Sequence, residues 1–198
     1  MSKIKICGLS RMEDIAAVNR CRPDYIGFVF AKSRRQVTPE RAKELKNALD
    51  TGIQVVGVFV NAPPDEIAAL AGEGLMDLVQ LHGEEDEAAV RQVKALTGLP
   101  VIKALRVDSR ESVLCWRDSA ADYLLLDNGP GGTGQRFDWS LLPEMHRPYF
   151  LAGGLCIENL PEALALSPYC LDVSSGAETG GVKDADKIEQ IVRMVRKG

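Results

Sequence analysis

The stretches YIGFVF, residues 25–30, and QVVGVFV, residues 54–60, decide the fold class. Both runs are apolar almost without interruption and rich in β-branched and aromatic residues, as expected for strands of a parallel sheet covered on both faces. Between them, Thr38 and Pro39 precede the charged run RAKELKNAL, which is a typical start of a helix. The two stretches therefore predict a strand–helix–strand unit.

The same unit recurs along the chain. Further helices are predicted where DEIAALAGEG follows Asn61 to Pro64, over Glu84 to Leu96, and over Asp184 to Lys197, while any helix between Asp127 and Leu142 must be short. Eight apolar runs are predicted strands: Lys3 to Ile6, Tyr25 to Phe30, Ile53 to Val60, Leu78 to Leu81, Val101 to Leu105, Tyr123 to Leu126, Pro148 to Ala152 and Leu171 to Val173.

Strands that alternate with helices pair in parallel through right-handed crossovers. Eight such units predict an α/β fold, a closed (β/α)8 TIM barrel, for which about 200 residues is the lower limit of size. The alternative is a doubly wound open sheet, which usually has fewer strands and a glycine-rich turn after the first strand. Here the glycine pattern of that type, Gly131 to Gly134, follows the sixth strand. We therefore expect one barrel domain of near-minimal size over residues 1–198.

Composition excludes several classes of protein. Of the 198 residues 45% are hydrophobic and 26% are charged, which is typical of a globular chain and not of a disordered or collagen-like one. The formal net charge of −4 leaves no basic footprint for nucleic acid, and no apolar run is long enough to cross a membrane. The five cysteines form no CxxC pair, so we expect neither disulfides nor a zinc site, and a cytoplasmic location.

In a barrel of this type the active site lies where the strands end. The segments LAGGL, residues 151–155, and DVSSGAE, residues 172–178, place glycines and small hydroxyls after the last two strands, where backbone N–H groups can bind an anion. The alternative is that the glycines only form tight turns. We favour a phosphate site formed by Gly153, Gly154, Ser174, Ser175 and Gly176.

The strand ends also carry motifs whose order along the chain is informative. They are KICGL (5–9), GFVF (27–30), SRRQV (33–37), GVFVN (57–61), QLHG (80–83), LLLD (124–127), GGTGQRFDW (131–139), LAGGL and DVSSGAE. This set spans nearly the whole chain and resembles the phosphoribosylanthranilate isomerase family. The resemblance implies the third step from chorismate in tryptophan biosynthesis, without metal or organic cofactor. That step is the Amadori rearrangement of N-(5′-phosphoribosyl)anthranilate, a small phosphorylated substrate, to 1-(o-carboxyphenylamino)-1-deoxyribulose 5-phosphate.

The resemblance also implies roles for individual residues. Cys7 is the expected general base and Asp127 the general acid, while Arg35 is expected to pair with the anthranilate carboxylate. Arg34 stands beside Arg35 where the family often has proline, so it is an alternative partner for that carboxylate. Strand parity places Lys5 on the same face as Cys7, and we hypothesise that its charge favours the thiolate.

Three further positions are candidates for substrate binding. Gly132, in the GGTG turn, is expected to let the backbone approach the substrate closely, and the alternative is a plain surface loop. His82 ends the fourth strand and either contacts the substrate or is a packed, hydrogen-bonded histidine. Asp172 either binds a ribose hydroxyl or braces its loop.

Two other enzymes of phosphorylated sugars are disfavoured. The histidine-pathway isomerase has aspartates at the ends of strands one and five, where this chain has Cys7 and Leu105-Arg106. Indole-glycerol-phosphate synthase needs a longer chain with an additional N-terminal helical segment. A catalytically silent barrel that only binds a phosphorylated ligand is the remaining alternative, and the presence of Cys7 and Asp127 argues against it. We expect a monomer, with a homodimer as the alternative.

Overall fold

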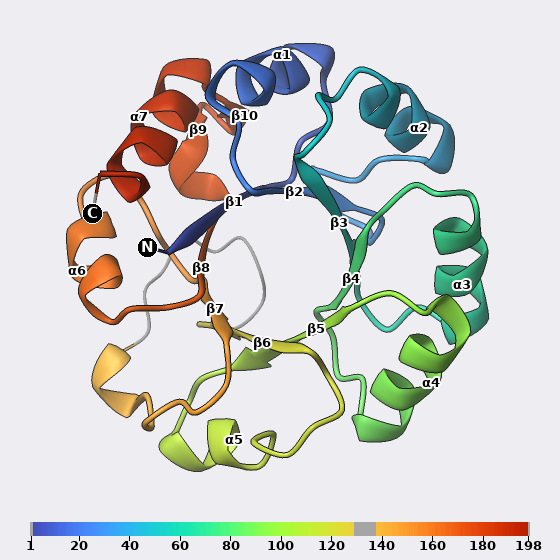
Figure 1. Cartoon of the computed structure of the whole chain (residues 1–198), viewed down its shortest axis with the longest axis vertical. Coiled ribbons are helices and arrows are strands. Elements are labelled where there is room, and N and C mark those ends of the chain that lie inside the picture. Colours follow the sequence, from blue (N-terminus) through green and yellow to red (C-terminus); the bar gives the residue numbers. More distant parts are fainter. Residues whose placement is uncertain (1, 129–137, 198) are drawn as a thin grey trace.

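The strands form a closed parallel barrel surrounded by helices (Figure 1). The computed structural model describes residues 2–128 and 138–197. Neighbouring strands pair in chain order and the last returns to the first, which confirms the predicted TIM barrel. The barrel strands are β1 (Lys3–Cys7), β2 (Tyr25–Val29), β3 (Gln54–Phe59), β4 (Leu78–Leu81), β5 (Val101–Arg106), β6 (Tyr123–Asp127), β7 (Tyr149–Leu151) and β8 (Cys170–Val173).

Successive side chains of each strand point alternately outward and inward, which gives one hydrophobic cluster outside the strands and a second one inside the barrel. On β1, Ile4 and Ile6 point outward into the cluster between strands and helices, whereas Cys7 belongs to a second cluster inside the barrel. The inward face carries the chemistry, because Lys5 also lies on it and is fully buried. The register of β8 against β1 sets Asp172 directly beside Lys5.

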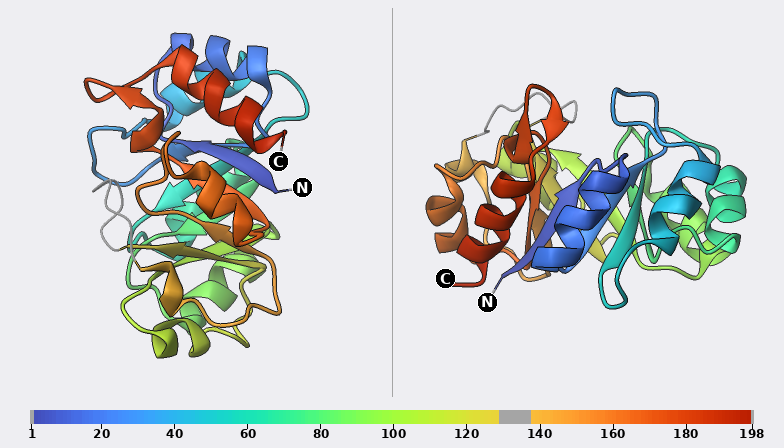
Figure 2. Two further views of the ribbon diagram at one scale, coloured as in Figure 1. Left: turned by 90° about the vertical axis from the view of Figure 1, so that its left-hand side faces the viewer. Right: turned by 90° about the horizontal axis from the view of Figure 1, so that it is seen from above.

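Within residues 2–128 and 138–197, seven α-helices cover the outside of the barrel, and two views from the side show them packed along the strands (Figure 2). Four of them, α2, α3, α4 and α7, are predicted from the sequence. Helix α4 begins at Glu87 and not at Glu84, because the Asp86 side chain accepts the Ala89 N–H and so caps it. The helices are α1 (Met12–Cys21), α2 (Pro39–Asn47), α3 (Pro64–Gly72), α4 (Glu87–Thr97), α5 (Arg110–Leu114), α6 (Leu160–Ala165) and α7 (Ala185–Val195).

Short elements complete the C-terminal end of the barrel. The strand β8 is followed by a 3-10 turn, η2 (Ser175–Ala177), and by an antiparallel pair, β9 (Glu178–Thr179) and β10 (Val182–Lys183). A second 3-10 turn, η1 (Trp139–Leu141), agrees with the expectation of a short helix in this part of the chain. Among residues 2–128 and 138–197, no helix combines the length and the hydropathy that a membrane crossing requires.

Candidate active site

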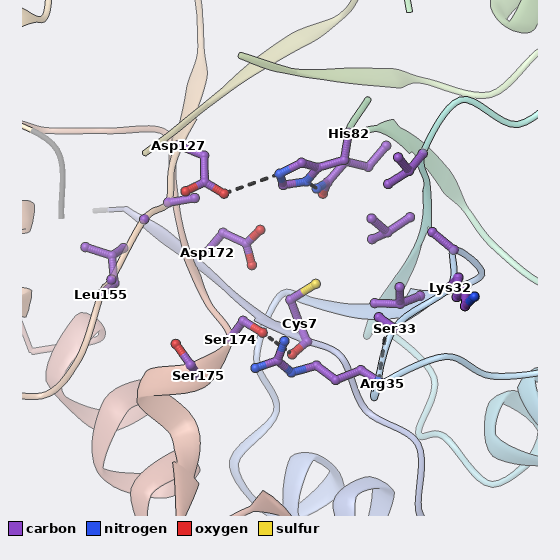
Figure 3. Close-up of a pocket in the computed structure, with 18 residues that line it drawn as sticks. Cys7, Lys32, Ser33, Arg35, His82, Asp127, Leu155, Asp172, Ser174 and Ser175 are labelled. Atoms are coloured by element: carbon purple, nitrogen blue, oxygen red, sulfur yellow. Dashed lines mark hydrogen bonds and ion pairs between the residues drawn. The ribbon is translucent and has the colours of Figure 1, made fainter. Parts of the chain in front are cut away.

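A cavity of about 290 Å³ opens at the C-terminal ends of the strands (Figure 3). Most of the residues predicted to catalyse or to bind substrate and phosphate line it. Arg34, the alternative to Arg35, does not, nor does Lys5. Gly176 is not among the lining residues, and Gly132 lies outside the described part of the chain. The predicted residues that do line the cavity are Cys7, Arg35, His82, Asp127, Gly153, Gly154, Asp172, Ser174 and Ser175.

Cys7 is the last residue of β1 and its thiol is buried at the floor of the cavity. Gly27 lies opposite it on β2, and a side-chain carbon there would come within 2.6 Å of the Cys7 Sγ. The glycine of the GFVF motif therefore provides the space that the thiol occupies. Burial raises the pKa of Cys7, and the positive charges of Lys5 and Lys183 oppose that rise.

The effect of Lys5 on the thiol has the expected direction, but burial outweighs it. The Lys5 Nζ donates to Asp172 Oδ2 at 2.8 Å and to Gln80 Oε1 at 2.6 Å. Although burial opposes its charge, the Asp172 carboxylate and Cys7 hold the pKa of Lys5 above its ordinary value. Lys5 therefore remains an ammonium beside a thiol that is mainly protonated at neutral pH.

Asp127 ends β6 and faces His82, which follows β4 (Figure 3). The His82 Nε2 lies 3.3 Å from Asp127 Oδ2, and the Asp127 Oδ1 accepts the backbone N–H of Asn128 at 2.6 Å. On its other side, the His82 ring places Nδ1 2.7 Å from the amide nitrogen of Gln80. Thus His82 is held by a hydrogen bond and also lines the cavity, and its contact with a substrate stays a prediction.

Asp172 uses only one of its carboxylate oxygens within the described residues. Oδ2 is paired with Lys5, whereas Oδ1 is buried and has no hydrogen-bond partner there. No described hydrogen bond joins this side chain to its own loop, so the bracing role considered for it is not seen. A buried acceptor that borders a cavity is costly unless a ligand or a water molecule donates to it.

Arg35 and Arg34 both bind Glu178, the first residue of β9, but only Arg35 lines the cavity. Arg35 holds the carboxylate in a fork, with Nε–Oε1 at 2.6 Å and a terminal nitrogen 3.1 Å from Oε2. Lys183 adds a third cation at 2.6 Å from Glu178 Oε1. The side chain of Arg34 is 54% exposed and that of Arg35 is 13% exposed.

The loops after β7 and β8 meet where the sequence places the phosphate site. Gly153 and Gly154 have φ angles of +84° and +64°, a left-handed backbone that favours glycine. Within the described part of the chain their N–H groups have no hydrogen-bond partner. Gly176 instead allows close packing, because a side-chain carbon there would lie 2.0 Å from the carbonyl oxygen of Leu155.

Comparison with known proteins assigns this architecture to a family. The sequence model of the N-(5′-phosphoribosyl)anthranilate (PRA) isomerase family matches residues 4–194. The chain belongs to this family. It is therefore a PRA isomerase, an enzyme of tryptophan biosynthesis, as the motifs at the strand ends predict.

Relatives cover the PRA isomerase chain from end to end. The enzyme of Endomicrobium trichonymphae is 47% identical and covers 99% of each chain. A PRA isomerase solved in complex with reduced 1-(o-carboxyphenylamino)-1-deoxyribulose 5-phosphate is 33% identical, with a TM-score of 0.85 over 100% of both chains. The mutually generated monomers of the dimeric PRA isomerase from Thermotoga maritima are 34% identical, with a TM-score of 0.86 over 99% of each chain.

Three residues that contact site residues in this PRA isomerase were not predicted from the sequence. Gln80 and Glu178 lie in quoted motifs but received no role, and Lys183 was not considered. An amide inside the short apolar strand LVQL, two residues before His82, could have drawn attention to Gln80. Nothing local signals the other two, because Glu178 meets Arg35 across 143 residues of sequence.

Proposed function

We propose that this PRA isomerase works by general acid–base catalysis with Asp127 as the acid and Cys7 as the base. Asp127 donates a proton to the ribose ring oxygen, so that the C1′–O bond breaks and an iminium forms. Cys7 as thiolate then removes the proton from C2′, which gives an enolamine that tautomerises to the ketone. Each group contributes about 10²–10⁴-fold to the rate.

The observation that carries this proposal is that both side chains border one cavity from different sides of the barrel. Cys7 comes from β1 and Asp127 from β6, and β8 and β7 separate these strands. A substrate between them meets an acid and a base at once. The raised pKa of Cys7 makes the thiolate scarce at neutral pH, but the same thiolate is a stronger base when it forms.

We assign the anthranilate carboxylate to Arg35 and not to Arg34. Arg35 borders the cavity and is largely shielded, whereas Arg34 lies outside the lining and is mostly exposed. Glu178 occupies Nε and one terminal nitrogen of Arg35, which leaves N–H donors on the far side of the guanidinium. Three cations surround Glu178, so the cluster remains positive overall and favours an anionic ring substituent.

The ribose phosphate is proposed to bind the loops after β7 and β8. The N–H groups of Gly153 and Gly154, with the hydroxyl of Ser175, supply donors on one wall of the cavity. The Ser174 hydroxyl donates to the carbonyl oxygen of Cys7 at 3.2 Å and joins the phosphate site when it rotates toward the anion. Asp172 Oδ1 is the proposed acceptor for a ribose hydroxyl, since it is buried beside the cavity without a partner in the described residues. A relative bound to a reduced product analogue supports the phosphorylated ligand.

We further propose a single domain over residues 1–198, a cytoplasmic location and a monomer. Pairing of β8 with β1 and contact of α7 with α1 support one domain, and five unpaired cysteines suit a reducing compartment. The Thermotoga maritima relative is dimeric, so a homodimer is the alternative. Large exposed apolar side chains are spread over separate segments, which favours the monomer: Met12, Val60, Leu96, Leu114 and Val182.

Turnover of two conservative variants tests the acid–base pair. The labile substrate is generated in place and the loss of anthranilate-type fluorescence is followed with purified protein. Asp127→Asn and Cys7→Ser each keep the size of the side chain, and we expect each to lower kcat about 10²–10⁴-fold. Asp118→Asn and Cys115→Ser, at exposed positions outside the cavity, are the matched controls and keep full activity. Near-normal turnover in either site variant would refute its role.

A further inference from the structure

One polar network crosses the interior of the barrel, and three of its four side chains line the cavity. It runs from Lys5 on β1 to Gln80 on β4, then to His82 after β4, and reaches Asp127 on β6. Lys5 and Gln80 are 0% and 1% exposed, so water does not satisfy their polar groups. Lys5 and Gln80 must therefore pair their donors and acceptors with neighbouring protein atoms.

Lys5 determines which groups donate and which accept hydrogen bonds along this polar network. An ammonium has three donors and no acceptor, so the atom that faces it at 2.6 Å must be the Gln80 carbonyl oxygen. The opposite orientation of the amide would press two donor groups together in a buried place, at the cost of a lost hydrogen bond to a charged group. Because Lys5 is also paired with Asp172, its charge and position are well defined.

The orientation of Gln80 determines the state of His82. With its oxygen on Lys5, the Gln80 amide presents N–H to His82 Nδ1, 2.7 Å away. His82 Nδ1 must then be the unprotonated, accepting nitrogen. The imidazolium is disfavoured for the same reason, because its Nδ1–H would face the N–H of Gln80.

We propose that Gln80 is a positioning residue that holds His82 as the neutral tautomer with its proton on Nε2, the ring nitrogen that lies beside the carboxyl group of Asp127. This inference rests on the proposed role of Asp127 as the acid. The Nε2 nitrogen lies 3.3 Å from Asp127 Oδ2 but makes no hydrogen bond with it in the structure, and such contacts often tighten only in the reacting complex.

The tautomer has a consequence for the acid. A histidine whose Nε2 already carries a proton has no free lone pair for the proton of Asp127. His82 therefore orients the Asp127 carboxyl group as a donor to it and does not act as its base. A proton on Asp127 is left for the ring oxygen of the substrate, and Lys5 links this arrangement to the thiol of Cys7 on the other side.

Nitrogen-15 NMR of histidine-labelled protein at neutral pH tests the tautomer directly. The chain has two histidines, and His146 is exposed, so the His146→Gln variant assigns both ring systems. We expect His82 to show a protonated Nε2 and an unprotonated Nδ1. A protonated Nδ1 in the wild-type protein, as either the other tautomer or the imidazolium, would overturn the proposal.

The isosteric variant Gln80→Glu tests the link to catalysis. A carboxylate offers oxygen to Lys5 and to His82 alike, so it requires a proton on His82 Nδ1. We expect the NMR pattern of His82 to change accordingly and kcat to fall about 10–100-fold with little change in KM, as for other groups that orient a functional histidine. Gln54→Glu, the same exchange at an exposed position, is the control and changes neither.

The two readouts separate the possible failures. A changed NMR pattern with unchanged kcat would refute the positioning role, and so would a lower kcat with an unchanged pattern. If Gln80→Glu does not fold, the wild-type spectrum still decides the tautomer. Failure of the acid assignment itself would appear elsewhere, as full activity of Asp127→Asn.

Discussion

At the N-terminal end of the barrel interior the rings of Tyr25, Tyr123 and Tyr169 surround Phe150, with ring centroids 5.4–5.8 Å from that of Phe150. Their polar atoms are used locally, because the Tyr25 and Tyr169 hydroxyls lie 3.0 Å apart and Lys3 donates to Tyr25. At the C-terminal end, buried atoms of His82 and Asp172 lack hydrogen-bond partners within the described residues.

The difference shows how one barrel divides its interior between stability and chemistry. At the N-terminal end, aromatic rings fill the interior and their hydroxyls are hydrogen-bonded to one another, which is typical of a region that contributes to stability. The cavity end leaves acceptors and donors at its wall, a cost that the substrate offsets when it binds. Substitutions at the two ends are therefore expected to separate stability from activity.

The largest expected effect is on stability and comes from Phe150→Ala. Phe150 is fully buried, so its removal leaves a hole between three tyrosines and lowers the free energy of unfolding by about 3–5 kcal/mol. Urea denaturation measures this change, and turnover of the folded fraction stays unchanged. Val182→Ala, at a side chain that is 44% exposed, is the control, with an effect of about 0.5 kcal/mol or less. Loss of activity in fully folded Phe150→Ala would break the division between the ends.

An intermediate effect is expected at the cavity end from Lys183→Met. The charge of Lys183 favours the Cys7 thiolate, so its loss raises the pKa of that thiol further. Because the thiolate is the reactive form, alkylation of Cys7 slows at any given pH and its pH profile moves to higher pH. Mass spectrometry of the Cys7 peptide follows the reaction, with exposed Cys115 as internal reference.

The substitution Lys43→Met, at an exposed position on α2, serves as the control for Lys183→Met and leaves the profile of Cys7 in place. Glu178 retains Arg34 and Arg35 as partners after loss of Lys183, which limits the structural effect. Unchanged alkylation of Cys7 in Lys183→Met would mean that the charge of Lys183 does not act on the thiol.

The smallest effect is expected from Tyr169→Phe at the packed end. It removes the hydroxyl that pairs with Tyr25 but keeps the ring that stacks on Tyr123 at 5.1 Å. One hydrogen bond of this kind contributes about 1 kcal/mol to the free energy of unfolding, and denaturant titration can resolve that loss. The kcat and KM should remain those of the wild type, and a change in either would show that the two ends are coupled.

Local patterns were sufficient to predict the barrel but not all of its helices. Apolar runs such as YIGFVF mark buried parallel strands, and all eight predicted runs lie in the barrel. The helices α5 (Arg110–Leu114) and α6 (Leu160–Ala165) span five and six residues, too few for a helical period to stand out. Asp127 extends β6 by one residue beyond the prediction, because pairing with β5 continues to that point.

The sequence predicts which residues lie in the site where their place on a strand determines it. It does not predict contacts between segments that are far apart in the sequence. Cys7 and Asp127 follow from their places at strand ends together with the family motifs. The fork between Arg35 and Glu178 depends on the loop after β2 meeting the β9–β10 pair, which no local pattern encodes. Gln80 acquires its role from Lys5, 75 residues away in the sequence.

The pairing of Lys5 with Asp172 can form only late in the synthesis of the chain. The two residues are 167 positions apart, and synthesis at about 5–20 residues per second separates their appearance by roughly 8–33 seconds. During that interval Lys5 and Cys7 have been made while the strand that encloses them has not. Barrel closure and completion of the cavity wall are thus one late event, in which the end of the chain buries the charge placed near its beginning.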